Sequence, residues 1–143
     1  MTNDFETLIS GQQFKKIYEK KSNRITEEYG LNKIEIEILA FLGSTHYDQA
    51  KDIAQLRFFS KAHVSKAIDN LIRSGYLLGT FDEDDRRRVH LELTEESQPV
   101  LAEIRKLQNN LTQTLFSGVT EEEKQTMLSV AKKIVHNINN ELH

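Results

Sequence analysis

Hydrogen-bond donors gather on one side of a short segment near the middle of the chain. Between Ser60 and Gly75, side chains that donate hydrogen bonds recur at helical spacing: Lys61, His63, Ser65, Lys66, Asn70 and Arg73. Such side chains bind phosphate oxygens, and they also read the acceptors that base edges present in the major groove. These residue types in this pattern predict a helix face that contacts double-stranded DNA.

A second cationic cluster follows at the end of a polar turn from Asp82 to Arg88. The turn begins with acidic side chains and closes with Arg86, Arg87 and Arg88. Guanidinium groups bind backbone phosphates, and narrow A·T-rich minor grooves attract them. We expect these arginines to reach the backbone or the minor groove beside the donor-rich helix.

The segment from Ser60 to Thr94 contains the elements that must hold both clusters. Ser60 is a good N-cap and Gly75 a typical C-terminal stop, so a helix is predicted between them. Its other side is an apolar stripe made of Val64, Ala67, Ile68, Leu71 and Ile72. Alternating apolar and polar residues at 76–81 and 89–93 predict a two-stranded hairpin around the turn.

Two helices are predicted at the start of the chain. Residues 4–29 have an amphipathic pattern with a break or kink at Gly11–Gln13, and Gly30 ends the helix. Asn32 and Glu35 have the spacing of a capping box. The box opens a helix that is apolar on most sides and therefore buried, and Gly43–Ser44 breaks it.

A third helix is predicted from Asp48 to Arg57. Its expected inner face consists of Ala50, Ile53, Ala54 and Leu56. A tight turn joins it to the donor-rich helix, which is the arrangement of a helix-turn-helix, and the hairpin adds a wing. The aromatic residues Phe14, Tyr18, Phe41, Phe58 and Phe59 are expected in the core.

Two further helices close the chain. Pro99 belongs in the first turn of one, which ends at Gly118, and Thr120 with Glu123 predicts a capping box for the other. Both have apolar stripes that extend beyond a winged-helix core. A second copy of the chain is the economical way to bury them, and a two-fold dimer also suits a palindromic DNA site.

The sequence therefore predicts a mostly α fold with a small β-hairpin wing, in which terminal helices form a dimerisation region. Residues 1–143 are expected to be one domain, with a DNA-binding lobe at 33–94 and dimerisation helices at 4–29 and 97–142.

The chain resembles the MarR family of bacterial transcriptional regulators. The resemblance is most specific in the wing, from Asp85 to Thr94, where an Asp, one free position and an Arg precede alternating apolar residues that end in Leu-Thr. The segments Val64–Lys66 and Gly75–Leu77 are similar to the family's recognition helix and its exit.

The resemblance implies a homodimer that binds a pseudo-palindromic operator, is modulated by a small ligand and most often acts as a repressor. Arg87 would enter the minor groove and Asp85 would hold it in place. The full set of DNA-binding residues implied in this way is Ser60, Lys61, His63, Ser65, Lys66, Asp85, Arg87 and Arg88.

Composition restricts the other functions. The chain has no cysteine, which excludes disulfides and thiolate metal sites, and it lacks a glycine-rich phosphate loop and a nucleophile elbow. We expect no enzyme activity, no catalytic or metal-binding residues and no cofactor. Neither a signal peptide nor a membrane span is recognisable, so a cytoplasmic protein without membrane contact is expected.

Two alternatives stay open. The net charge of −3, Gly79 at a position where many family members have arginine, and the acidic turn favour a winged-helix protein-interaction module without specific DNA binding. A metal-responsive regulator would instead assemble ligands across the fold, for instance His46 with Asp or Glu residues.

Overall fold

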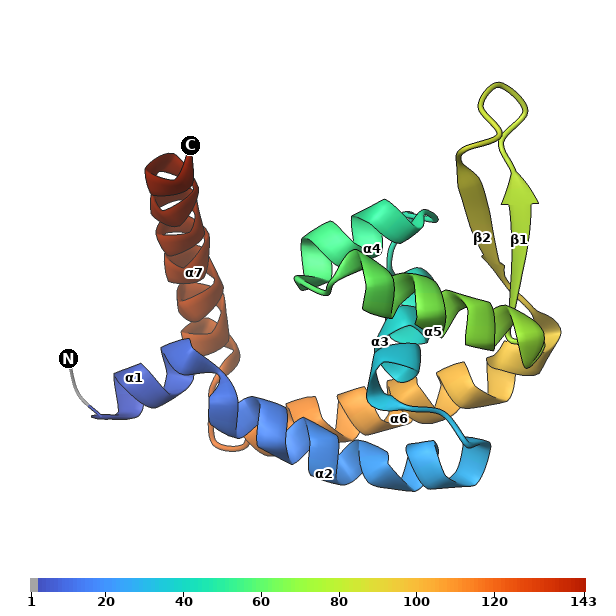
Figure 1. Ribbon diagram of the computed structural model, residues 1–143. Coiled ribbons are helices and arrows are strands. Elements are labelled where there is room, and N and C mark those ends of the chain that lie inside the picture. Colours follow the sequence, from blue (N-terminus) through green and yellow to red (C-terminus); the bar gives the residue numbers. More distant parts are fainter. Residues whose placement is uncertain (1–2) are drawn as a thin grey trace. The chain divides into compact units, whose positions relative to one another are not determined.

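The computed structural model describes residues 3–143, which form two compact units. One unit ends at Asn109 and the other runs from Asn110 to His143. The elements are α1 (Asn3–Ser10), α2 (Gln12–Tyr29), α3 (Lys33–Ser44), α4 (Ala50–Arg57), α5 (Lys61–Arg73), β1 (Leu77–Phe81), β2 (Val89–Leu93), a 3₁₀ turn η1 (Glu95–Ser97), α6 (Gln98–Leu115) and α7 (Glu121–Leu142). The predicted fold, mostly α with a two-stranded wing, is confirmed (Figure 1).

Gly11 separates the first predicted helix into α1 and α2. Its φ of 65° lies in the left-handed region, which glycine adopts without a steric cost, and this confirms the predicted break. Gly30, also at φ 65°, ends α2 as predicted. The Asn32 side chain then accepts from the Glu35 backbone N–H, and the Glu35 carboxylate accepts from the Asn32 N–H, both at 2.9 Å, so the predicted capping box opens α3.

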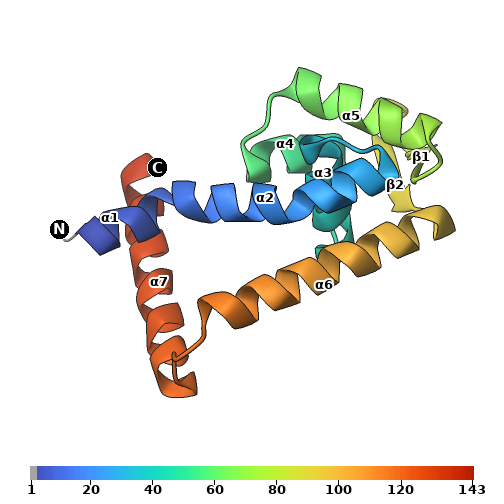
Figure 2. The ribbon, with the colours of Figure 1, turned by 90° about the horizontal axis from the view of Figure 1, so that it is seen from below.

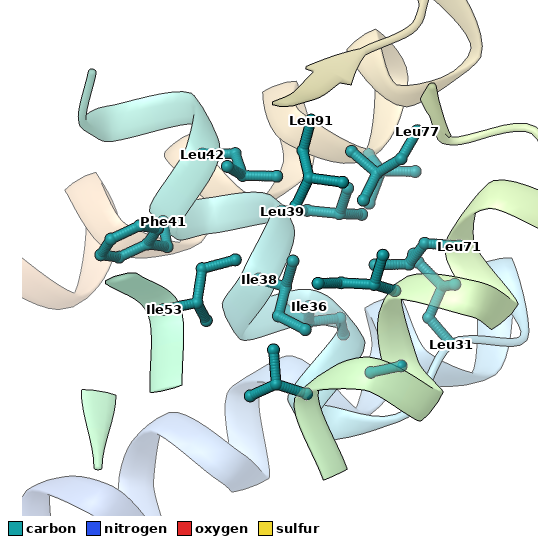
Figure 3. Close-up of a cluster of buried hydrophobic side chains, with 14 of the residues drawn as sticks. Leu31, Ile36, Ile38, Leu39, Phe41, Leu42, Ile53, Leu71, Leu77 and Leu91 are labelled. Carbon is teal, nitrogen blue, oxygen red and sulfur yellow. The ribbon is translucent and has the colours of Figure 1, made fainter. Parts of the chain in front are cut away.

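Helix α3 is the centre of the first unit. In both ribbon views it lies between α5 and the first part of α6 (Figures 1 and 2). Its side chains meet those of the surrounding elements in one cluster (Figure 3), whose fully buried members include Ile38, Leu39, Phe41, Ile53, Leu71 and Leu77. Each such side chain contributes roughly 1.5–3 kcal/mol when buried.

Helix α3 ends at Ser44 with Thr45 as its C-cap, so it stops at the predicted Gly43–Ser44 break, although both residues still belong to its last turn. A Cβ added at Gly43 would lie 3.0 Å from Leu101 Cδ2, so the glycine allows α6 to approach α3 closely. Gly43 is therefore also a packing position.

The helix-turn-helix is formed by α4 and α5, with three departures from the predicted details. Helix α4 begins at Ala50, not Asp48, and Leu56 is exposed because it lies on the outer side of this short helix. Ile72, expected in the core stripe of α5, is also partly exposed near the wing. Val64, Ala67, Ile68 and Leu71 are buried as predicted.

Phe58 in the turn between the two helices is not a core residue. It caps α4 in the left-handed region at φ 57°, and 93% of it is exposed. Phe14 is also half exposed, whereas Phe41 is buried and Phe59 packs against the core. A bulky residue with positive φ is a steric outlier, and here no packing offsets it.

The exit of α5 sets the start of the wing. The Tyr76 N–H donates to the Leu71 carbonyl and the Gly75 N–H to the Ile72 carbonyl, with Gly75 at φ 87°, which is a Schellman motif. Strands β1 and β2 then pair antiparallel, with Leu77 opposite Leu93 and Phe81 opposite Val89. Val89 and Ile72 crowd the position that a side chain at Gly79 would take, which explains a glycine there.

The second unit contains the end of α6 and the whole of α7. Pro99 is in the first turn of α6, and the reciprocal hydrogen bonds of Thr120 and Glu123 open α7, both as predicted. Helix α7 has no buried residue, and a row of its apolar side chains is exposed: Met127, Leu128, Val130, Ile134, Val135, Ile138 and Leu142. No helix within residues 3–143 has the length and apolar character needed to cross a bilayer.

Replacing Phe58 by asparagine is expected to stabilise the first unit. Asparagine tolerates the left-handed region far better, and the exposed Phe58 ring gives up no packing, so the free energy of unfolding should rise by about 0.5–1 kcal/mol. Urea unfolding of the Phe58→Asn protein measures this. The same substitution at the exposed helical residue Gln55 should slightly lower stability. Lower stability for Phe58→Asn would contradict the strain.

Candidate nucleic-acid interface

The outer face of α5 carries the first predicted cluster. Four donors are exposed on this face: Lys61, His63, Ser65 and Lys66. Most of the apolar residues on the opposite face of the helix are buried. The Ser60 hydroxyl accepts from the His63 backbone N–H at 3.1 Å and fixes the first turn. That turn contains no acidic side chain, so the helix N-terminus and Lys61 together form a positive end suited to a phosphate.

Asp82 organises the wing turn that holds the second cluster. Its Oδ2 atom accepts hydrogen bonds from the backbone N–H groups of Asp84 and Asp85, both at 3.0 Å. The Asp82 N–H donates to the Arg88 carbonyl at 3.0 Å and closes the turn. The hydrogen bond with His90, followed by those from the Asp84 and Asp85 N–H groups, lowers the pKa of the Asp82 carboxyl.

Asp85 contacts the wing-tip arginine. Its Oδ1 atom accepts from the backbone N–H of Arg87 at 3.0 Å and from Arg87 Nε at 3.1 Å. Arg88 Nε lies 3.8 Å from the other carboxylate oxygen. The hydrogen bonds from Arg87 lower the pKa of the Asp85 carboxyl. The Arg87 side chain is nevertheless 91% exposed, so its guanidinium is oriented at one nitrogen and available at the others.

His90 in β2 is a member of the wing that the sequence reasoning did not single out. Its Nδ1 lies 2.8 Å from an oxygen of Asp48, and its Nε2 lies 2.7 Å from Asp82 Oδ1. The hydrogen bond to Asp82, followed by the one to Asp48, raises the pKa of the His90 imidazole. Asp48 lies 42 positions before His90, so no local spacing pattern predicts this contact. The available signals were the position of Asp48 just before α4 and the alternating apolar and polar residues of β2.

The two clusters lie on different parts of one lobe. The exposed donors at 61–66 occupy the first turns of α5, and the hairpin follows the C-terminal end of this helix and projects away (Figure 1). The helix therefore presents hydrogen-bond donors along its outer face, and the wing presents arginines at its tip. All eight predicted residues lie on these two surfaces, where seven are exposed and Asp85 is half-buried. Their contacts with DNA stay a prediction.

A cavity of about 520 Å³ lies among α2, α3 and the turn into α5. Its lining includes Lys15, Tyr18, Glu37, Arg57 and Phe59. Burial raises the pKa of the Glu37 carboxyl, against the opposing effect of Arg57 and Lys15, and burial also raises the pKa of the Tyr18 phenol. The cavity thus combines an aromatic wall with charged groups of both signs.

No set of three or more His, Asp or Glu side chains within residues 3–143 is arranged to hold a metal ion. His46, which the sequence reasoning considered for such a site, stacks on Tyr47 with ring centroids 4.9 Å apart.

Comparison with known proteins agrees with this geometry. Residues 31–97 match the family described as a winged helix DNA-binding domain. The HTH-type transcriptional regulator YkoM of Bacillus subtilis is 26% identical over 125 residues, 87% of this chain and 80% of YkoM. The transcriptional repressor MprA of Escherichia coli is 25% identical over 115 residues, 79% of this chain and 65% of MprA. A MarR protein from Peptoclostridium difficile superimposes with a TM-score of 0.78 at 24% identity, covering 98% of this chain and 90% of that one.

The lobe with its donor-rich helix and arginine-tipped hairpin has the winged helix-turn-helix fold, and it is similar to the winged helix DNA-binding domain over residues 31–97. The chain has the fold of the MarR regulators, which confirms the resemblance predicted from its wing and recognition helix. Its relatives are named as regulators, in agreement with the expectation that it is not an enzyme.

Removing the Asp85 carboxylate is expected to weaken DNA binding, although the change makes the wing more positive. Without its two hydrogen bonds the Arg87 side chain loses its direction, so the Asp85→Ala protein should bind specific DNA several-fold less tightly. Asp84→Ala is the matched control, because it removes the same charge from the same turn without that contact. Equal or tighter binding by Asp85→Ala in fluorescence anisotropy would contradict a positioning role.

Proposed function

We propose that this protein is a transcriptional regulator that binds a pseudo-palindromic operator as a homodimer and acts as a repressor. The observation that carries the proposal is the pairing of a donor-rich, exposed α5 face with an arginine that Asp85 orients at the wing tip. In cells it would act in the cytoplasm, where it meets chromosomal DNA. The name of the relative MprA supports repression.

Helix α5 would enter the major groove. Lys66 and Ser65 lie in the middle of its exposed face and would contact base edges, while Lys61, His63 and the Ser60 end of the helix would meet bases or phosphates. The wing would place Arg87 in the adjacent minor groove and Arg88 near the backbone. Phosphate neutralisation would then supply most of the affinity and make it depend on salt.

The net charge of −3 does not oppose this proposal, because two of the acidic groups in the wing turn, Asp82 and Asp85, are half-buried and hydrogen-bonded within the wing. Asp82 and Asp85 accept hydrogen bonds from the turn itself, from His90 and from Arg87. Carboxylates satisfied in this way present less negative charge to a phosphate. The acidic turn therefore gives little support to a protein-interaction module.

Exposed apolar surface supports dimerisation. Helix α7 exposes a row of large apolar side chains along its length, and α1 exposes Phe5, Leu8 and Ile9. Exposed apolar side chains along a helix, as each of these two helices has them, are typical of an interaction site. A second copy of the chain is the partner we propose, because two recognition helices are needed for a palindromic operator.

The cavity near α2 and α3 is where we propose that a small effector binds. An aromatic wall from Tyr18 and Phe59, with Arg57 and Lys15 nearby, suits an aromatic or anionic molecule. Because the cavity also borders the turn into α5, an occupant would change the balance between DNA-competent and incompetent arrangements.

The test of DNA binding is fluorescence anisotropy with DNA upstream of the protein's own gene, a scrambled duplex and two salt concentrations. We expect specific binding that weakens steeply with salt. Arg87→Ala should lose about 1–3 kcal/mol of specific binding, the scale of a good groove contact. Arg86→Ala removes the same charge from the neighbouring position, and it should reduce the affinity for the specific and the scrambled duplex by the same factor. Unchanged affinity of Arg87→Ala would remove the wing from recognition.

The test of the dimer is a charge placed in the apolar row of α7. Ile134→Glu should weaken dimerisation at least tenfold, about 1.4 kcal/mol, because a carboxylate would be buried without a partner. Ser129→Glu adds the same charge on the polar side of the helix and should leave the dimer intact. Sedimentation velocity over a range of concentrations measures both. A monomeric wild-type protein would contradict the dimer.

A further inference from the structure

We propose that His90 is a positioning residue that, as an imidazolium, ties the wing turn to the segment before α4 and so sets the direction of Arg87. The contact set Asp48, His90 and Asp82 is called here the His90 bridge. The proposal rests on the function proposed above and deepens it, because it names what holds the minor-groove arginine relative to the recognition lobe.

The geometry of the His90 bridge requires a charged ring. One carboxylate oxygen lies 2.8 Å from Nδ1 and another lies 2.7 Å from Nε2. Ionised carboxylates only accept hydrogen bonds, and a neutral imidazole has one N–H donor. Both contacts are hydrogen bonds only when both ring nitrogens carry a proton. A neutral ring would turn one nitrogen lone pair toward a carboxylate and lose that contact.

A continuous run of bonds leads from the ring to the wing tip. Asp82, which binds His90 through Oδ1, uses Oδ2 to accept from the backbone N–H groups of Asp84 and Asp85. Asp85 in turn holds Arg87 at both its backbone N–H and its Nε. The ring therefore fixes the residue that organises the turn, and the turn fixes the arginine.

The other end of the bridge is attached to the helix-turn-helix. The Asp48 carbonyl accepts from the Leu91 N–H at 2.8 Å, so the segment before α4 lies along the free edge of β2. The Asp48 side chain adds the contact to the His90 ring. Together they join the hairpin to the lobe that carries α5 at a place distant from the Gly75 exit.

The charged groups in contact with the ring are Asp48 from the segment before α4 and Asp82 from the wing turn. Its neighbour on β1 is Thr80, which is uncharged, and Glu92 on its own strand is exposed. Both contacting groups favour the protonated ring, and they raise its pKa above the ordinary value of 6.5. The bridge is therefore complete below that value and is lost as pH rises through the raised pKa.

Asp48→Asn separates this proposal from a merely structural role. An amide at 48 can donate to an unprotonated Nδ1 while Nε2–H still donates to Asp82, so the neutral ring keeps both contacts. The variant should keep the wing ordered at high pH, whereas the wild-type wing should loosen. Asp48→Ala removes the contact and should loosen the wing at every pH.

The first readout needs no DNA. NMR would follow the His90 ring and the backbone order of Asp85 and Arg87 in the full chain from pH 5.5 to 9. We expect the wild-type His90 to titrate above pH 6.5, and the backbone order of Asp85 and Arg87 to fall over the same pH range. In Asp48→Asn we expect a lower His90 pKa and a backbone order that does not change with pH. A wild-type His90 that titrates at or below 6.5, or identical order profiles for the two proteins, would overturn the bridge.

The second readout is operator affinity by anisotropy between pH 6 and 8.5. His63 on the outer face of α5 is present in both proteins, so the ratio of wild-type to Asp48→Asn affinity isolates the bridge. We expect this ratio to fall several-fold as pH rises, and a constant ratio would overturn the positioning role. Loss of wing order with pH, but no DNA binding by either protein, would overturn the proposed function and leave the bridge established.

Discussion

The burial of α3 is the constraint on which the rest of the structure depends. This helix has apolar side chains on nearly all sides, and no single neighbour can cover them. Helices α2, α4 and α5, strand β2 and the start of α6 each cover one part of its surface. The outer face of α5 is exposed to solvent because its inner face is committed to α3, so core packing determines which side chains are available for DNA.

Local hydrogen bonding explains how an acidic chain can present a basic surface. The carboxylates of Asp82 and Asp85 in the wing turn accept hydrogen bonds from donors two or three residues away, and the Asp85 carboxylate directs Arg87. Charge at a binding surface depends on where side chains point more than on their sum. The acidic residues at the start of α7 similarly lie at a helix N-terminus, where their negative charges interact favourably with the positive end of the helix dipole.

What could be predicted from the sequence was mainly local. Capping boxes, the Gly75 exit and the break at Gly11 involve residues a few positions apart, so spacing alone identifies them. The Asp85–Arg87 contact is equally local, and the family resemblance implied it. The errors were of another kind. Phe58 looked like core because hydrophobic character does not reveal a left-handed backbone, and the close contact of Gly43 with Leu101 is invisible in the sequence.

The same distinction separates the two attachments of the wing. The Schellman motif at Gly75 is local and fixes where β1 leaves α5, and the buried side chains of Leu77 and Leu91 pack the base of the hairpin on the core. Nearer the tip, the attachment comes from a distant part of the chain, where Asp48 contacts Leu91 through its carbonyl and His90 through its carboxylate. Recognition of two grooves at once depends on a fixed distance between α5 and the wing tip. That distance therefore depends on a non-local contact with an exposed, titratable ring, and it is the part of the interface that local sequence patterns describe least.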